Sequence, residues 1–353
     1  MTQENAINQA KEAIGKAQPD DYILTPTKHA AELKDKAPAL AAILNSSELT
    51  ITAEQYENYD KEALAAQNEF RHVFNRANGL ALATAVLVAL VLATGILQSF
   101  LPGNTEHYVI IGLSIGAIIT GALAAKDLNT VKQGELLKDW MAKRAAAECS
   151  RLEYFNTVAT APVAPTGEIP TALLKFEYFR RYQLDVQLAF FKRRGAKLRE
   201  DARKTLSYSS WAIAGAAIAT GIAGILSVVK PHFAAIATLG SVFAALSAYA
   251  TIREQIYQSQ RIAERYTLTV NTLQNLSRKL DDVRNAIFTL GDLPMLDFIA
   301  AIHEQLSLEH KQWLGEHNNA QDVVDKLEAA LKKAAAQLTS KADTTKATVQ
   351  STP

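Results

Sequence analysis

Cysteine is almost absent from this chain of 353 residues, since Cys149 is the only one. A single cysteine excludes a disulfide framework within one chain, and a reduced compartment is the simplest expectation for it. Its neighbours Ala147, Glu148 and Ser150 supply no evident base to activate a thiol. Packing is therefore its expected role.

The chain also lacks the motifs of common enzyme chemistries. It has no glycine-rich phosphate loop followed by Lys and Ser or Thr, no paired zinc cysteines and no His-Glu-x-x-His. His303, His310 and His317 recur every seven residues, about two helical turns or ~10 Å apart, too far for a shared metal. We predict no enzyme activity, no cofactor and no metal, and a solvated stripe for these histidines.

Charge is missing from four long apolar stretches, in which no Asp, Glu, Lys, Arg or His occurs. Each is close to the roughly 20 residues that a spanning helix needs. A core of unusual size would be required to bury all four in a soluble protein. The sequence thus predicts an all-α integral membrane protein with four transmembrane helices at 79–101, 108–125, 207–229 and 233–252.

Only a few residues separate the members of each pair, so each pair is predicted to form a hairpin. Lys and Arg cluster beside the spans in the segments before, between and after the hairpins, whereas the hairpin tips carry only Lys230. Because basic flanks stay on the cytoplasmic side, both termini are predicted to be cytoplasmic. The absence of intramembrane charge argues against ion-coupled transport and voltage sensing, but not against a passive channel.

Outside the spans, apolar residues recur at alternating spacings of three and four, which is typical of helices that pack side by side as coiled-coil-like stalks. The run from Leu184 to Ala202 is predicted to pair with the run from Leu273 to Leu290, with Gly195 as a weak point. A capping-box pattern at Thr52 to Gln55 predicts the start of the first stalk. The resulting plan has short N-terminal helices (1–51), a stalk-hairpin-stalk unit (52–156), a linker (157–170), a second such unit (171–317), an amphipathic helix (318–338) and a disordered tail (339–353).

Short motifs flank the hairpins at comparable places. Trp140, Arg144 and Glu148 follow the second span, Gln187 precedes the third, and Glu304, Glu309 and Trp313 follow the fourth. This combination of helical approach, two-span hairpin and trailing helix resembles the SLATT family of bacterial two-transmembrane effector domains, with two copies in tandem. The second half departs from the first, because it has Arg261 and Glu264 in place of the tighter Arg144 and Glu148 pair and has no counterpart of Trp140.

The resemblance implies a bacterial inner-membrane effector that perforates or depolarises the membrane, with a cytoplasmic partner protein or signalling-nucleotide sensor as its trigger. Small residues on the spans would let helices approach closely, either within a hairpin or in a homo-oligomer. In the oligomer, span hydroxyls would line a weakly selective pore. The alternative is a non-conducting scaffold that organises partners through its cytoplasmic helices. The candidate packing residues are Gly112, Gly116, Ala216, Thr220, Gly224, Ala237, Ser241 and Ala245.

The basic cluster from Lys192 to Arg199 has three interpretations: a topology determinant, a contact for anionic lipid, or a nucleotide site, the last without a phosphate-cradling motif. No nucleic-acid partner is expected. The predicted C-terminal helix either docks on the stalk or recruits a partner protein.

Overall fold

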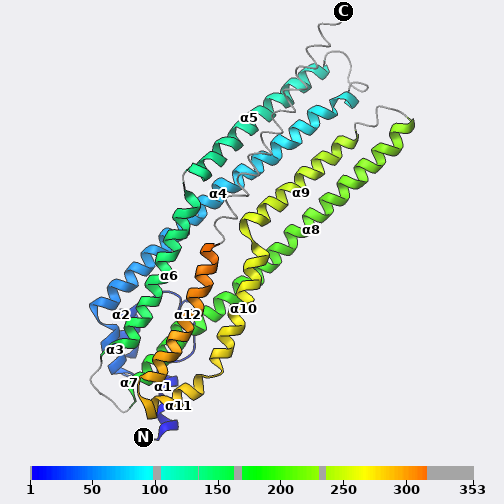
Figure 1. Ribbon diagram of the computed structural model, residues 1–353. Coiled ribbons are helices and arrows are strands. Elements are labelled where there is room, and N and C mark those ends of the chain that lie inside the picture. Colours follow the sequence, from blue (N-terminus) through cyan, green and yellow to red (C-terminus); the bar gives the residue numbers. More distant parts are fainter. Residues whose placement is uncertain (1, 98–104, 134, 163–168, 230–235, 316–353) are drawn as a thin grey trace, which may run out of the picture. The chain divides into compact units, whose positions relative to one another are not determined.

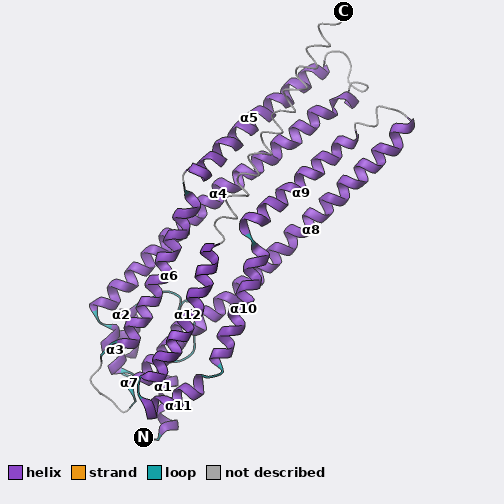
Figure 2. Cartoon of the chain, in the orientation of Figure 1, coloured by secondary structure: helices purple, strands orange, loops and turns teal. Residues whose placement is uncertain are grey.

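The computed structural model describes residues 2–97, 105–133, 135–162, 169–229 and 236–315. These residues are helical almost throughout, and no strand occurs among them (Figure 2). The predicted C-terminal helix 318–338 and tail 339–353 lie outside the described residues, as do residues 163–168 of the predicted linker. Figure 1 labels the helices along the chain.

Three short helices open the chain, and local signals explain their limits. The Thr2 side chain accepts from the backbone of Asn5 at the start of α1 (Gln3–Ile14), and Gly15, with φ of 75°, ends it. Proline stands in the first turn of both α2 (Pro26–Leu33) and α3 (Pro38–Leu44), where its missing N–H costs nothing.

The remaining helices are mostly long. The helix α4 begins at Ser47, five residues before the predicted capping box, and the Thr52 hydroxyl donates to the Glu48 carbonyl inside it. The Ser46 hydroxyl instead accepts from the backbone N–H of Leu49. The chain then forms α4 (Ser47–Leu97), α5 (Thr105–Gln133), α6 (Leu136–Thr160), α7 (Thr171–Phe179), a π-helical turn η1 (Arg180–Asp185), α8 (Val186–Val229), α9 (Ala237–Tyr257), α10 (Ser259–Ser277), α11 (Leu280–Leu290) and α12 (Leu293–Gly315).

The chain divides into two compact units, and each unit draws on segments from both halves of the sequence. Within the described residues, unit 1 comprises 2–67, 138–198 and 261–315, and unit 2 comprises 68–137 and 199–260. The tandem plan describes the order of elements along the chain, and it stays a prediction.

Unit 1 is built around α7, in which every residue from Ala172 to Phe179 is buried. Aromatic rings from three helices meet there: Phe155 of α6 lies 5.7 Å from Phe179, and Phe298 of α12 lies 5.4 Å from Phe176, measured between ring centroids. The same core takes in Leu40 of α3 and Leu273 of α10. A single hydrophobic core therefore joins segments that are far apart in sequence.

The predicted stalk pairing involves α8 and α10 within unit 1. The Phe191 and Tyr266 rings lie 4.9 Å apart, and a Cβ at Gly195 would lie 3.3 Å from the Tyr266 Cβ. Gly195 is thus a point of close helix approach, and α8 runs through it without a break. The second apolar run is not one helix, because the chain turns between α10 and α11.

In unit 2, α4 packs against α5, and α8 packs against α9. The Thr84 hydroxyl donates to the Thr120 hydroxyl across the first pair, at 2.9 Å. Ser209 and Ser247 share a hydrogen bond of the same length across the second pair. Side chains of α4 also contact α9, since the buried Asn78 amide donates to the Tyr249 carbonyl at 3.3 Å.

Three helical stretches are long and apolar enough to cross a membrane: they lie within Ser47–Thr94, His107–Thr160 and Thr171–Val228. Their apolar parts belong to α4, α5 and α8. A fourth span is not confirmed, because α9 begins at Ala237 and residues 233–235 lie outside the described part. The fold is therefore all-helical with three candidate membrane helices.

Candidate functional site

The first candidate site is a charged cluster in unit 1 that contains several of the motif residues. Arg144 of α6 donates to the Asp60 carboxylate of α4 at 2.8 Å and also to Glu148, one turn further along α6. The Glu148 carboxylate, and to a lesser degree Asp60, raises the pKa of Arg144, which keeps the guanidinium charged.

Glu309 of α12 belongs to the same neighbourhood, through Tyr266 of α10. It pairs with Arg265 at 3.6 Å, and both of these side chains are largely enclosed. Burial, together with the Glu309 carboxylate, raises the pKa of Tyr266 to about 12, while Arg144 and Arg265 act in the opposite sense. Two motif residues from different halves of the sequence, Arg144 and Glu309, thus both act on the phenol group of Tyr266.

The other motif positions do not join this cluster in the same way. Glu304 is exposed on α12, while Gln187 on α8 and Trp140 on α6 are half-buried. The side chain of Trp313 lies outside the described part of α12. Of the seven motif positions, the structure therefore brings Arg144, Glu148 and Glu309 into one electrostatic environment.

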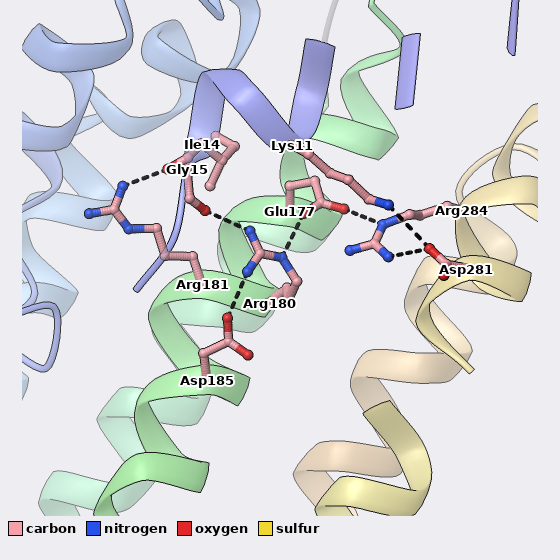
Figure 3. A network of polar contacts seen from close by, with 9 residues as sticks. All are labelled: Lys11, Ile14, Gly15, Glu177, Arg180, Arg181, Asp185, Asp281 and Arg284. Atoms are coloured by element: carbon pink, nitrogen blue, oxygen red, sulfur yellow. Dashed lines mark hydrogen bonds and ion pairs between the residues drawn. The ribbon is translucent and has the colours of Figure 1, made fainter. Parts of the chain in front are cut away.

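Figure 3 shows a second polar network in unit 1, which the sequence analysis did not predict. Glu177 of α7 is fully buried and accepts hydrogen bonds from Arg180, at 2.6 Å, and from Arg284 of α11, at 2.5 Å. Arg180 also donates to the Gly15 carbonyl at the end of α1, and Arg284 to Asp281. One carboxylate therefore links α7, η1 and α11, and through Arg180 also α1.

Arg151 of α6 forms the centre of a third buried group, and its hydrogen-bond partners are neutral. Its guanidinium donates to the Gln183 side chain at 2.7 Å, to the Tyr56 hydroxyl at 3.0 Å, and to the carbonyls of Tyr22 and Tyr182. Buried charges usually need such complete hydrogen bonding when no carboxylate is adjacent. Arg151 thus fixes η1 against α6 and α4.

Two histidines of this unit, His29 and His303, are largely enclosed; the side chain of His310 and all of His317 lie outside the described part of the chain. His29 shares a hydrogen bond of 2.8 Å with Tyr178, whose hydroxyl bonds to Tyr154 at 2.7 Å. His303 lies 5.6 Å from the Phe179 ring, so the predicted solvated stripe is wrong at this position. Burial lowers the pKa of both His29 and His303 to about 4. Both rings are therefore neutral at pH 7.

The candidate packing residues of α5 and α8 differ in what they face. A Cβ at Gly116 would lie 3.4 Å from Leu87 of α4, whereas one at Gly112 would have nothing within 4 Å. Ala216 and Thr220 face Gly240 of α9, where a Cβ would lie 2.8 Å from the Thr220 hydroxyl. Part of the small-residue surface of α5, and part of that of α8, is therefore in contact with another helix of the same chain.

The remaining packing candidates are largely open. A Cβ at Gly224 would have nothing within 4 Å, and Ala237 and Ser241 on α9 are exposed. Ala245 is half-buried. Contacts of α9 with α8 include those of Gly240, Phe243 and Ser247, none of which was a predicted packing residue.

A polar band lies near the ends of the apolar stretches in unit 2. Arg76 of α4 forms two hydrogen bonds of 2.6 Å with Asp127 of α5, whose carboxylate is almost fully buried. The Tyr257 hydroxyl of α9 donates to Asn75 at 2.8 Å. Charged residues just outside the apolar runs are the sequence pattern that indicates such a band. Which of these residues pair with one another could not be predicted from the sequence.

Within the described ranges, no group of three or more His, Cys, Asp or Glu side chains could hold a metal ion. Cys149 is exposed on α6. Fold and polar clusters together define a class: an all-helical protein that combines three apolar, membrane-length helices with a helical unit whose hydrophobic core contains buried polar networks. No model of a known protein family, no curated protein and no solved structure matches the chain.

Proposed function

We propose that this chain is a membrane effector that resembles SLATT-domain proteins and depolarises the bacterial inner membrane as a homo-oligomer. In this proposal four helices span the bilayer as two hairpins, α4 with α5 and α8 with α9, and both termini are cytoplasmic. The fourth span would include residues ahead of Ala237. The contacts within each helix pair and the basic flanks support this arrangement. The resemblance itself rests on the quoted motif residues and the order of elements.

The observation that carries the proposal is the open small-residue surface of the apolar helices. At Gly112, Gly221 and Gly224 an added Cβ would meet nothing within 4 Å, although Gly116, Gly215 and Gly240 are in close contact inside the chain. Small residues promote helix association in a bilayer because they allow backbones to approach closely. An open surface of this kind is suited to a neighbouring copy of the chain.

One observation favours the alternative of a non-conducting scaffold. Several hydroxyls that would line a pore are engaged inside the chain: Thr84 bonds to Thr120, and Ser247 bonds to Ser209. The Thr220 hydroxyl donates to the Ala216 carbonyl. Helix pairs closed in this way would anchor unit 1 and any partner that it binds, without conducting ions.

Membrane potential during induced expression in bacteria separates the two proposals. We expect the wild-type chain to depolarise the inner membrane, and Gly112→Ile and Gly224→Ile to lose this activity at equal membrane levels. Gly79→Ile is the matched control, because it adds the same side chain at another open position outside these surfaces. Gly116→Ile would report instead on the contact of α5 with Leu87.

An unchanged potential with the wild-type chain would favour the scaffold. Equal loss of depolarisation in Gly79→Ile would show that bulk alone is disruptive, and the assembly proposal would then lose its support.

A further inference from the structure

One face of α8 in unit 2 carries a row of exposed side chains whose chemistry changes in order along the helix. Members of the row recur at spacings of three, four or seven residues, so they share one face of the helix. The row consists of Lys204, Tyr208, Trp211, Ile218, Ile222 and Ile225. In its longest gap, a Cβ at Gly215 would lie 2.9 Å from the Phe243 ring of α9. The face therefore passes from charged to aromatic and then to aliphatic.

The two aromatic side chains are the most informative members of the row, because Trp211 is 75 % exposed and Tyr208 is 70 % exposed. Large apolar side chains that are exposed together usually mark a surface that something covers. Tyrosine and tryptophan combine an apolar ring with a polar O–H or N–H group, which favours the boundary between water and hydrocarbon. Lys204, which pairs with Glu200 at 2.6 Å, ends the row on the charged side.

Contacts between helices show that the polarity changes at the same level on three helices of unit 2. Ser209 of α8 shares a hydrogen bond with Ser247 of α9. Half a turn further along α9, the Tyr249 carbonyl accepts from Asn78 of α4. The apolar stretches lie to one side of this level, and on the other side each helix has a charged residue within six positions: Arg76 on α4, Arg253 on α9 and Lys204 on α8.

The distances along α8 match the dimensions of a bilayer. From Tyr208 to Ile225 the helix advances ~26 Å, which fits within the ~30 Å hydrocarbon core. Ile222 lies ~16 Å beyond Trp211, so it is at the middle of the core when Trp211 is at the edge. The order of the side chains and their spacing thus follow the polarity of a membrane from headgroup to acyl chain. A lipid surface is the occupant that this face fits.

We propose that Tyr208 and Trp211 form an interfacial anchor, which holds α8 at the boundary between the headgroups and the acyl chains of a phospholipid bilayer. Lys204 then faces the headgroups, and the three isoleucine side chains face the acyl chains. The inference rests on the membrane insertion in the proposed function, but not on conduction or assembly. It fixes the depth of α8, which enters the hydrocarbon core at Trp211.

The test uses the full chain, reconstituted in phospholipid vesicles whose acyl chains carry bromine either close to the headgroup or close to the end of the chain. Bromine quenches tryptophan emission at short range. The variant W140F/W313F leaves Trp211 as the only tryptophan. We expect bromine close to the headgroup to quench its emission more strongly than bromine at the chain end.

The matched control, W140F/W211F/I222W/W313F, carries its only tryptophan at position 222 of the same face. We expect the reverse order of quenching there, because this position lies at the middle of the core. A second measurement does not depend on these multiple variants: in the otherwise native chain, the quenching that Trp211→Phe removes is the contribution of Trp211. Far-ultraviolet circular dichroism checks that all variants keep the same helix content.

Stronger quenching of Trp211 by bromine at the chain end would place the residue inside the core and overturn the anchor. Quenching by aqueous acrylamide alone would leave Trp211 in water, open to a partner protein. Quenching by neither agent would mean that a second copy of the chain covers it, and both outcomes overturn the anchor.

Recovery of the chain in the soluble fraction, measured first, would refute the proposed membrane function and the anchor with it. A chain that stays in the membrane fraction but fails the quenching test would refute the anchor alone.

Discussion

Glu177 is the most completely enclosed charged residue in the described part of the chain, with 0 % of its surface exposed. Its two arginine partners are also mostly buried, with 13 % of the Arg180 side chain and 7 % of the Arg284 side chain exposed. Removing one member of a buried ion pair leaves a charge that water cannot solvate. The stability of unit 1 should therefore depend strongly on this carboxylate.

We expect Glu177→Gln to lower the free energy of unfolding by roughly 3–5 kcal/mol, because both guanidinium groups lose their buried counter-charge. Thermal or denaturant unfolding followed by circular dichroism measures the effect. Asp281→Asn is the matched control: it neutralises a carboxylate bonded to the same Arg284, but one whose side chain is 77 % exposed. Its cost should stay within about 1 kcal/mol. Similar losses in the two variants would contradict the argument from burial.

The sequence held a partial signal for this network. Lys175 and Glu177 interrupt the otherwise apolar run from Leu173 to Phe179, and charges inside such a run are buried with partners or mark the edge of a helix face. The partners could not be predicted, because Arg284 is 107 residues away and many other basic residues were equally eligible. Pairing in the core depends on tertiary packing, which local patterns do not encode.

Among the elements, the contact of α8 with α10 depends on a glycine. A Cβ at Gly195 would lie 3.3 Å from the Tyr266 Cβ and 3.8 Å from the Ala263 carbonyl oxygen. Alanine could be accommodated by a small shift, whereas a branched side chain would force the helices apart. Glycine here therefore serves close packing and not flexibility.

We expect Gly195→Val to destabilise unit 1 by about 1–3 kcal/mol, as overpacking usually does. Ala189→Val, at an exposed position of the same helix, is the control. Valine has a lower helix propensity than alanine and a higher one than glycine, so propensity alone would make the control the worse variant. If Gly195→Val proves as stable as Ala189→Val, or more stable, as judged by the unfolding midpoints, the packing role of Gly195 is refuted.

Prediction of the elements succeeded where a single physical property decides them. The apolar parts of α4, α5 and α8 could be predicted because absence of charge over about 20 residues is a property of composition. The predicted start of α4 at Thr52 was wrong: the Thr52 hydroxyl bonds to the Glu48 carbonyl inside the helix, and the Ser46 hydroxyl accepts from the backbone N–H of Leu49 at its beginning. The turn between α10 and α11 was missed, because the apolar spacing continues across it.

For the whole molecule, the orientation of the chain is the prediction with the widest consequences. Cys149 is the only cysteine and is exposed on α6, so it reports directly on one side of the membrane. In intact bacteria we expect Cys149 to be protected from a membrane-impermeant maleimide and to react after permeabilisation. In a Cys149→Ser background, a cysteine placed at Asn104 should react in intact cells.

Labelling of Cys149 in intact cells would invert or abolish the proposed orientation. Protection of the cysteine at Asn104 in intact cells would refute the first hairpin, and the four-span arrangement with it. Equal protein levels and labelling after denaturation control for expression and for thiol oxidation.

Because unit 1 is built from segments that are far apart in sequence, its folding depends on the order in which those segments are synthesised. Lys11 pairs with Asp281, 270 residues later, and Gln3 bonds to Asn285. At about 5–20 residues per second, the ribosome needs on the order of 15 to 50 s to supply these partners. The apolar parts of α4, α5 and α8 all emerge within that interval. The N-terminal helices must therefore wait, incompletely packed, until the apolar helices have left the ribosome, and a chain truncated before α11 could not complete the fold of unit 1.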